Sequence, residues 1–143
     1  MTPGIFVTGT DTEVGKTYVS ALIAQQLRSQ GVKVGVYKPA ASGCIETADG
    51  SLFSEDADAL WNAAGKPATV NHVCPQMFRA PLAPHLSARA EGLELDRNKL
   101  FAGIEYWQQN SDFIIVEGAG GLMSPISDDD FVADLAYEFG YPL

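Results

Sequence analysis

The sequence has few basic residues, few histidines and no long apolar stretches. It contains 9 Lys and Arg against 18 Asp and Glu, which gives a formal net charge of -9. This acidic balance disfavours a broad surface for nucleic acid or anionic membrane, although it is compatible with a local cationic pocket. No run approaches the roughly 20 apolar residues that a membrane span requires. We therefore expect a soluble, cytoplasmic protein that binds neither nucleic acid nor membrane.

Cysteine is also scarce. Cys44 and Cys74 lie far apart, and the chain has only 2 histidines, so no zinc-ligand spacing is present. We expect two reduced thiols, with a disulfide as the alternative. The 143 residues, 46% of them hydrophobic, are enough for one compact core and too few for two. We predict a single domain over residues 1–143.

The first 37 residues alternate between two kinds of hydrophobic pattern. The short apolar run "GIFVTG" and the segment Val32–Tyr37 are typical of buried strands. Between them, apolar residues recur at helical spacing up to Gly31, at Val19, Leu22, Ile23 and Leu27. A helix-length connection between two apolar strands predicts a right-handed βαβ unit and a parallel sheet.

The remainder of the chain extends this alternation. We predict a loop over 40–52 and then a helix from the N-cap Ser54 to Gly65. A strand or extended piece near Val70–Phe78 and a loop should follow, and then a helix over 95–110. The last predicted elements are a strand over 112–117, which ends in a glycine-rich turn, and a helix from the N-cap Asp130 to Gly140. The final "YPL" resembles the approach to another strand. The pattern predicts an α/β, three-layer fold with a mainly parallel central sheet flanked by helices, which the phosphate-binding loop described next makes P-loop NTPase-like. We expect it to be incomplete at the C-terminus, as the N-terminal part of a longer protein.

The loop after the first strand, "TGTDTEVGKT", is similar to a phosphate-binding loop. The strict motif needs a glycine where Thr10 stands, but Gly15, Lys16 and Thr17 complete it. Backbone N–H groups at a helix N-terminus bind phosphate, Lys16 would contact the β- and γ-phosphates, and the Thr17 hydroxyl would ligate Mg²⁺. The alternative is a chance tripeptide at a helix start, which the preceding apolar strand disfavours.

The run "FIIVEGAGG" is the second motif. Glu117 follows four apolar residues, at the position where P-loop proteins place a metal-binding acid. Mg²⁺ prefers oxygen ligands, which Thr17, a carboxylate and phosphate oxygens can supply. The small residues from Gly118 to Gly121 would let the backbone approach a ligand closely.

The third motif is "YKPAASG", at the end of the second predicted strand. Ligands bind at the carboxyl edge of parallel sheets, so Lys38 and Ser42 would face the same crevice as Lys16. A strand-end lysine is more often a solvated surface residue. Two lysines directed at one crevice in an acidic chain instead favour a site for negative charge that develops during a reaction.

Together, "GTDTEVGKT", "YKPAASG", "SEDADAL", "APLAPHLSA" and "VEGAGG" closely resemble the dethiobiotin synthetase family. The resemblance implies a cytoplasmic, homodimeric ligase that uses ATP, Mg²⁺ and CO₂ to close 7,8-diaminononanoate into a cyclic urea. It implies catalytic roles for Lys16 and Lys38, substrate contacts for Thr12 and Ser42, and metal ligation by Thr17, Asp56 and Glu117. The implied ATP-binding residues are Glu13, Val14, Gly15, Lys16, Thr17, Tyr18, Asp56, Glu117, Gly118, Ala119 and Gly120.

Several alternatives remain open at this point. Asp58 is the fallback for Asp56 as the metal ligand, and His85 matches the family without a role that the residues explain. A partitioning-type ATPase or a cobyrinate-type amide synthase is a competing function, but Asp11 stands where partitioning ATPases carry a signature lysine. A non-catalytic nucleotide-binding subunit is a further alternative. We also predict that Asp11 and Glu13 face the diamine, Mg²⁺ or a lysine instead of the ATP phosphates.

Overall fold

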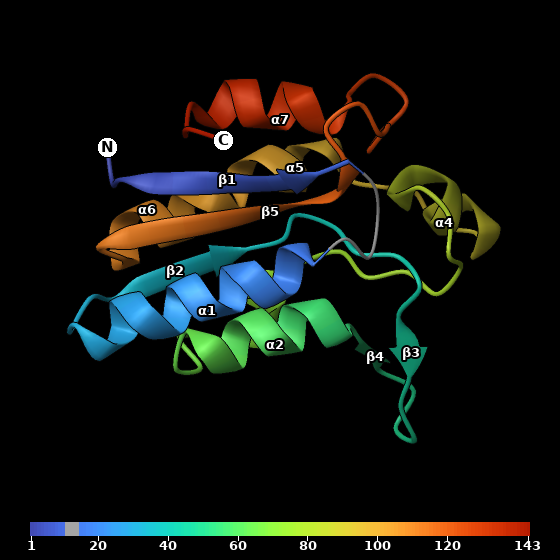
Figure 1. The fold of residues 1–143 in the computed structure, drawn as a ribbon. Helices are drawn as coiled ribbons and strands as arrows, with labels where there is room; N and C mark the ends of the chain where they lie inside the picture. Colours follow the sequence, from blue (N-terminus) through green and yellow to red (C-terminus); the bar gives the residue numbers. More distant parts are fainter. Residues whose placement is uncertain (11–14) are drawn as a thin grey trace.

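The structure is a computed structural model that describes residues 1–10 and 15–143. Its largest sheet has three parallel strands in the order β1-β5-β2, and a separate two-stranded antiparallel hairpin consists of β3 and β4. Figure 1 shows the arrangement. The strands are β1 (Gly4–Gly9), β2 (Val34–Tyr37), β3 (Ile45–Glu46), β4 (Leu52–Phe53) and β5 (Phe113–Gly121). The helices are α1 (Lys16–Ser29), α2 (Glu55–Ala63), α3 (Val70–Val73), α4 (Pro84–Ala90), α5 (Arg97–Ala102), α6 (Ile104–Asn110) and α7 (Val132–Phe139).

The parallel sheet confirms the predicted fold class. β5 carries the continuous apolar run and pairs with β1 on one side and β2 on the other. A strand covered on both faces is mostly apolar, and Ile114, Ile115 and Val116 are fully buried. The crossover from β1 through α1 to β2 therefore passes over the position that β5 occupies.

Helices cover both faces of the sheet and form the outer layers (Figure 1). α1 packs on the sheet and is backed by α2, while α5, α6 and α7 lie on the opposite face. Phe139 of α7 packs between the sheet and α5. The centre of its ring lies 6.5 Å from that of Phe6 and 6.2 Å from those of Tyr37 and Phe101. Buried aromatic contacts of this kind hold α7 and α5 together over the strands.

The structure corrects three predictions for the middle of the chain. The predicted loop over 40–52 contains β3, which pairs with β4. The predicted strand or extended piece Val70–Phe78 begins instead with the short helix α3. Its second half is joined to the segment after β2 by backbone hydrogen bonds, such as those from the Ala41 N–H to the Gln76 carbonyl and from the Phe78 N–H to the Ala41 carbonyl, both 2.9 Å. The loop predicted after it contains α4, whose first residue is proline. These segments are short, so neither helical nor strand periodicity had enough residues to appear.

The helix predicted over 95–110 is two helices that meet at Gly103. A Cβ at this position would lie 2.3 Å from the Tyr37 hydroxyl oxygen. That hydroxyl donates to the carbonyls of Lys99 (2.8 Å) and Leu100 (2.9 Å). These hydrogen bonds hold the last turn of α5 against the buried Tyr37. A contact between elements distant in sequence thus decides where α5 ends.

Two boundaries near the C-terminus also differ from the predictions. β5 continues through the glycine-rich segment to Gly121, where a turn was expected. α7 begins after Phe131 instead of Asp130, whose side chain accepts two hydrogen bonds from Arg97 at 2.7 and 2.9 Å. The predicted N-cap acid therefore anchors the loop before the helix to α5. The prediction that Gly140 ends the helix is confirmed by its left-handed φ of 69°.

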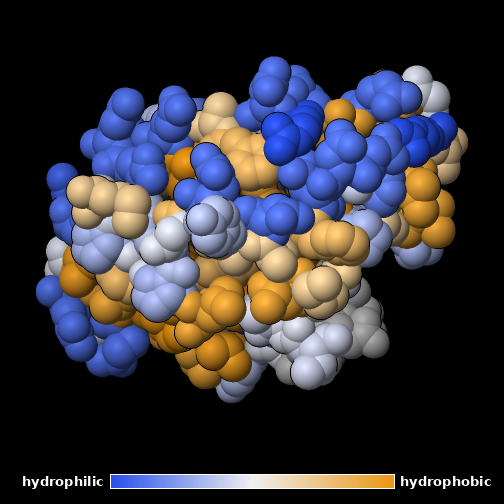
Figure 2. All heavy atoms as spheres, turned by 90° about the horizontal axis from the view of Figure 1, so that it is seen from above, coloured by the Kyte–Doolittle hydropathy of each residue, from blue (hydrophilic) through white to orange (hydrophobic). Residues whose placement is uncertain are grey.

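The surface seen from the α7 side mixes hydrophilic and hydrophobic areas, with hydrophobic side chains gathered toward one margin (Figure 2). In the parts of the chain that the structure describes, no helix is both long and apolar enough to cross a membrane. The segment after α7 returns to the sheet, where the Pro142 carbonyl accepts a hydrogen bond from the Phe6 N–H at 2.8 Å. The observed contact places the "YPL" segment beside β1.

Candidate active site

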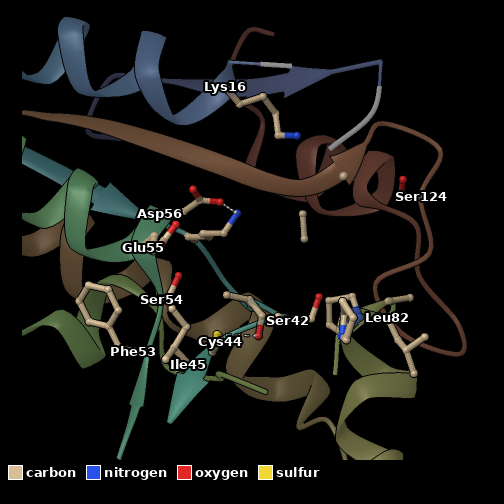
Figure 3. Close-up of a pocket in the computed structure, with 18 of the residues that line it drawn as sticks. Lys16, Ser42, Cys44, Ile45, Phe53, Ser54, Glu55, Asp56, Leu82 and Ser124 are labelled. Atoms are coloured by element: carbon tan, nitrogen blue, oxygen red, sulfur yellow. Dashed lines mark hydrogen bonds and ion pairs between the residues drawn. The ribbon is translucent and has the colours of Figure 1, made fainter. Parts of the chain in front are cut away.

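The carboxyl ends of β1, β2 and β5 lie at one edge of the sheet because the three strands are parallel. The segments that follow β2 and β5 border a pocket of about 660 Å³ at this edge. Figure 3 shows Lys16 reaching into this pocket from the α1 side and Asp56 lying across from it. Such edges are where α/β proteins bind ligands. The predicted site residues that line the pocket are Lys16, Lys38, Ser42, Asp56, Ala119 and Gly120.

A cluster of charges lies at the base of this pocket. The Lys38 ammonium is 3.4 Å from a Glu117 carboxylate oxygen and 3.7 Å from an Asp56 carboxylate oxygen. The Thr17 hydroxyl lies 2.9 and 3.0 Å from the two Glu117 oxygens and donates to them. Lys38 is therefore part of an internal network that joins the ends of β2 and β5 to the start of α1 and α2.

Burial determines the electrostatics of this network. Glu117 is fully buried and Lys38 is 5% exposed, whereas the Asp56 side chain is 54% exposed. Burial raises the pKa of the Glu117 carboxyl, while the Lys38 ammonium and the Thr17 hydroxyl oppose that rise. The two carboxylates thus have different environments, one enclosed and one facing the pocket.

Local sequence explains how α1 and α2 present their first residues. Gly15 precedes α1 with φ 98°, a left-handed conformation that glycine adopts without a Cβ clash. Lys16 and Thr17 are therefore the first residues of the helix. Ser54 caps α2 as predicted, because its hydroxyl accepts from the Ala57 N–H at 3.2 Å. The following turn places Asp56 at the pocket.

The structure separates Asp56 from Asp58. Asp58 accepts a hydrogen bond from the Asn62 side chain at 3.0 Å, one turn along α2, and it is half-buried and does not line the pocket. Tyr18 is 70% exposed and likewise does not line the pocket. A Cβ on Gly118 would lie 2.7 Å from a Val132 methyl group, so close packing against α7 explains this glycine. These three residues are not brought to the pocket wall.

The predictions for Asp11, Thr12, Glu13 and Val14 lie outside the described residues. The described residue before this gap, Thr10, makes a close backbone contact. A Cβ on Gly121 would lie 2.9 Å from the Thr10 carbonyl oxygen. The end of the "EGAGG" segment therefore packs directly against the start of the loop that follows β1.

Sequence reasoning missed the less polar wall of the pocket. This wall comes from the β3–β4 hairpin, the segment before α4, and the turn after β5. Its residues include Cys44, Ile45, Phe53, Leu82, Ser124 and Pro125. The motif "APLAPHLSA" was a signal for part of it, but it gave no role. His85 of that motif is half-buried, and its Nδ1 atom has no hydrogen-bond partner among the described residues.

The oxygen donors are suited to a hard cation, although only Asp56 of the three lines the pocket and Thr17 and Glu117 lie behind its wall. Thr17, Asp56 and Glu117 offer oxygen only, and the Lys38 ammonium already lies where the two carboxylates converge. Within residues 1–10 and 15–143, no group of three or more His, Cys, Asp and Glu residues could hold a metal ion. A metal here would need the threonine and phosphate oxygens as well, which is how Mg²⁺ is usually held beside nucleotides.

Comparison with known proteins agrees with this arrangement. A family model described as an AAA domain matches residues 3–143. The chain is 53% identical over 134 residues to an ATP-dependent dethiobiotin synthetase BioD of Rhodopirellula baltica, covering 93% of the chain and 52% of that relative. It is 39% identical over 127 residues to the enzyme of the same name from Clostridium botulinum (89% and 56%). It is 41% identical over 142 residues to that from Pseudomonas paraeruginosa (99% and 62%). The chain therefore spans between half and two thirds of the length of these relatives.

Proposed function

The chain belongs to the family described as an AAA domain, and from this membership we propose that it is the nucleotide-binding part of an ATP-dependent dethiobiotin synthetase. The proposed reaction joins 7,8-diaminononanoate and CO₂ into a cyclic urea, with conversion of ATP to ADP and phosphate. The observation that carries the proposal is the convergence of Lys16, Lys38 and Asp56 on one pocket at the carboxyl edge of a parallel sheet. The names of the three relatives support the choice of substrate.

The reaction requires negative charge to be stabilised three times. One substrate amine captures CO₂ as a carbamate and releases a proton. A carbamate oxygen then attacks the γ-phosphate, which releases ADP and forms a mixed anhydride. The second amine attacks the carbamate carbon and displaces phosphate, which closes the ring. Lys38 and Lys16 would stabilise the carbamate and the transferring phosphoryl group, because both ammonium groups border the pocket in a water-poor setting.

The other site residues have supporting roles in this proposal. Ser42 lines the pocket and would donate to the carbamate or the substrate amine region. Thr17, Asp56 and Glu117 would hold Mg²⁺, which when bound with ATP neutralises phosphate charge. The backbone of Ala119 and Gly120 would lie against the nucleotide phosphates or the carbamate. Glu13, Val14 and Thr12 stay in the proposal as nucleotide and substrate contacts on the family resemblance alone.

A direct assay tests the reaction. The full-length protein would be incubated with ATP, Mg²⁺, bicarbonate and 7,8-diaminononanoate, and the urea product would be measured by mass spectrometry. We expect one urea to form for each ATP converted to ADP and phosphate. ATP hydrolysis that is independent of the diamine would contradict the proposal. A homodimer in a cytoplasmic fraction is also expected from the resemblance, and sedimentation of the full-length protein would test its oligomeric state.

A matched pair of acids tests the site itself. Asp56→Asn should lower kcat/KM by at least about 10²-fold, the scale of losing an electrostatic contact to the reacting groups. Asp58→Asn is the control, because Asp58 lies two residues further along α2 and does not line the pocket. Its activity should stay within about twofold of the wild type. Equal losses in both variants would mean that damage to α2 explains the effect of Asp56→Asn.

A further inference from the structure

Ser124 lies in the turn after β5, where hydrogen bonds hold both its backbone and its side chain. Its N–H donates to the Gly121 carbonyl at 3.0 Å, and its carbonyl accepts from the Val132 N–H at 2.9 Å. Its hydroxyl oxygen accepts from the Gly121 N–H at 2.9 Å. These contacts give the Ser124 hydroxyl a defined place beside the end of β5.

The same contacts leave the proton of the Ser124 hydroxyl to be donated elsewhere. A serine hydroxyl offers one donor and two acceptor positions, and the Gly121 N–H uses one of the acceptor positions. Within residues 1–10 and 15–143, the hydroxyl donates to no acceptor. Ser124 is half-buried and lines the pocket, so a ligand bound there is the natural acceptor for this proton.

The wall on either side of Ser124 has few other hydrogen-bond donors. The segment before α4 and the turn after β5 line the pocket with Pro81, Leu82, Ala83, Pro84, Ser124 and Pro125. The prolines have no N–H, and the Leu82 N–H donates to the Ala80 carbonyl at 2.8 Å. Ser124 has the only polar side chain among these six residues. A single polar group on an otherwise apolar wall is typical of a residue that orients a ligand.

Donors from other elements border the same pocket. Figure 3 shows Ser124 at the end of β5, across from Asp56, with Lys16 reaching in from α1. Lys38 and Ser42 line the pocket from the segment that follows β2. Two ammonium groups and two hydroxyls therefore surround one space. An oxygen-rich anion accepts several such hydrogen bonds at once, which a methylene group or an ammonium does not.

We propose that the Ser124 hydroxyl donates a hydrogen bond to an anionic oxygen of the reacting groups, which makes it a further residue of the reaction site. This inference rests on the proposed function. In that reaction the carbamate and the transferring phosphoryl group both present charged oxygens. No proton is transferred, because the hydroxyl keeps its proton and acts as a dipole. Gly121 fixes that dipole before the ligand binds, so little reorganisation is needed as charge develops.

Two variants of the full-length protein test the donor. Ser124→Ala removes the hydroxyl, and Ser124→Thr keeps it. We expect kcat for urea formation to fall about 10- to 100-fold in the alanine variant, as for a lost hydrogen bond to a charged group. The threonine variant should stay within about threefold of the wild type. The Kd for the Mg²⁺ complex of β,γ-imido ATP then identifies the oxygen: a higher Kd in Ser124→Ala assigns it to the phosphoryl group, and an unchanged Kd assigns it to the carbamate.

Ser127→Ala is the matched control for damage to the turn. The Ser127 hydroxyl oxygen accepts from the Asp130 N–H at 2.9 Å, so this serine also holds the segment after β5, but it does not line the pocket. Both alanine variants should lower the melting temperature, since each leaves a backbone N–H without its acceptor. Measured well below either melting temperature, kcat of Ser127→Ala should stay within about twofold of the wild type.

Three results would overturn the inference. These are an unchanged kcat in Ser124→Ala, a threonine variant as impaired as the alanine variant, and an equal loss of kcat in Ser127→Ala. The last result would assign the effect to a loosened turn. If the wild-type protein forms no urea from the diamine, the proposed function fails, and the inference fails with it. Urea formation by the wild type with an unchanged kcat in Ser124→Ala removes the inference alone.

Discussion

Replacing Lys38 with methionine should destabilise the protein through the carboxylate that it leaves behind. Lys38 and Glu117 are 3.4 Å apart, and their side chains are 7% and 0% exposed. Methionine is similar in length and keeps most of the packing, so the main loss is the positive charge. Breaking a buried ion pair by removing one partner costs about 3–5 kcal/mol, because the remaining charge is uncompensated. We expect a decrease of this size in the free energy of unfolding at pH 8, without nucleotide or divalent metal.

The sign of the pH dependence follows from Glu117. Burial holds its pKa above the ordinary value in the folded protein, and Lys38 opposes that shift, so Lys38→Met should raise it further. At pH values between the pKa of Glu117 in the unfolded chain and its higher pKa in the folded protein, the carboxyl is protonated in the folded state and ionised in the unfolded state. Stability therefore falls as pH rises through this window, and the penalty in the variant is largest at pH 8 and smaller near pH 5.

Urea unfolding at both pH values, in EDTA, would measure this effect. The comparison needs the wild type, Lys38→Met, Glu117→Gln and the double variant. In the double variant the buried charge is gone, so most of the stability lost in Lys38→Met at pH 8 should return. The reasoning is refuted if Lys38→Met is equally destabilised at pH 5 and pH 8, or if Glu117→Gln in the same chain restores nothing. Either result would assign the cost to packing.

Two more stability predictions concern residues outside the pocket. Gly103→Ala should lower the free energy of unfolding by about 1–3 kcal/mol, since the new Cβ would overlap the Tyr37 hydroxyl and lie 2.7 and 2.8 Å from two carbons of its ring. In a Tyr37→Leu background, chemical denaturation should show a smaller loss from the same substitution, and equal losses in the two backgrounds would contradict the proposed clash. The hydrogen bond from Arg97 lowers the pKa of the Asp130 carboxyl, so this pair stabilises the fold at neutral pH and is lost as pH falls through the folded pKa. Asp130→Asn should accordingly narrow the difference in stability between pH 7 and pH 3, and an unchanged difference would mean that other acids account for it.

The long, strongly patterned elements of the fold were predictable from sequence, and the short ones were not. The apolar run of β5, the helical spacing in α1 and the Ser54 cap of α2 are local signals, and each element forms where its pattern indicates. The parallel order β1-β5-β2 was implied only in part, because which strand lies between β1 and β2 depends on pairing across the chain. β3, β4 and α3 have too few residues to show any period.

The site divides in the same way. Residue types and their order in the motifs were enough to select Lys16, Thr17, Lys38, Asp56 and Glu117 and to indicate the resemblance to dethiobiotin synthetases, which the three relatives confirm. The roles of these residues remain predictions. The motifs kept Asp58 as a fallback for Asp56, because both acids belong to the first turn of one helix and differ only in direction.

The sequence by itself determined the class of fold, the kind of ligand to expect and the residues that could meet it, because those depend on local pattern and residue chemistry. Only the tertiary structure decided which groups actually meet. It places the Lys38 ammonium between a buried and an exposed carboxylate, directs Asp58 away from the pocket, and adds Ile45 and Phe53 to the wall. Distance and burial set the strength of each charge and contact, and both arise from packing between segments far apart in the chain.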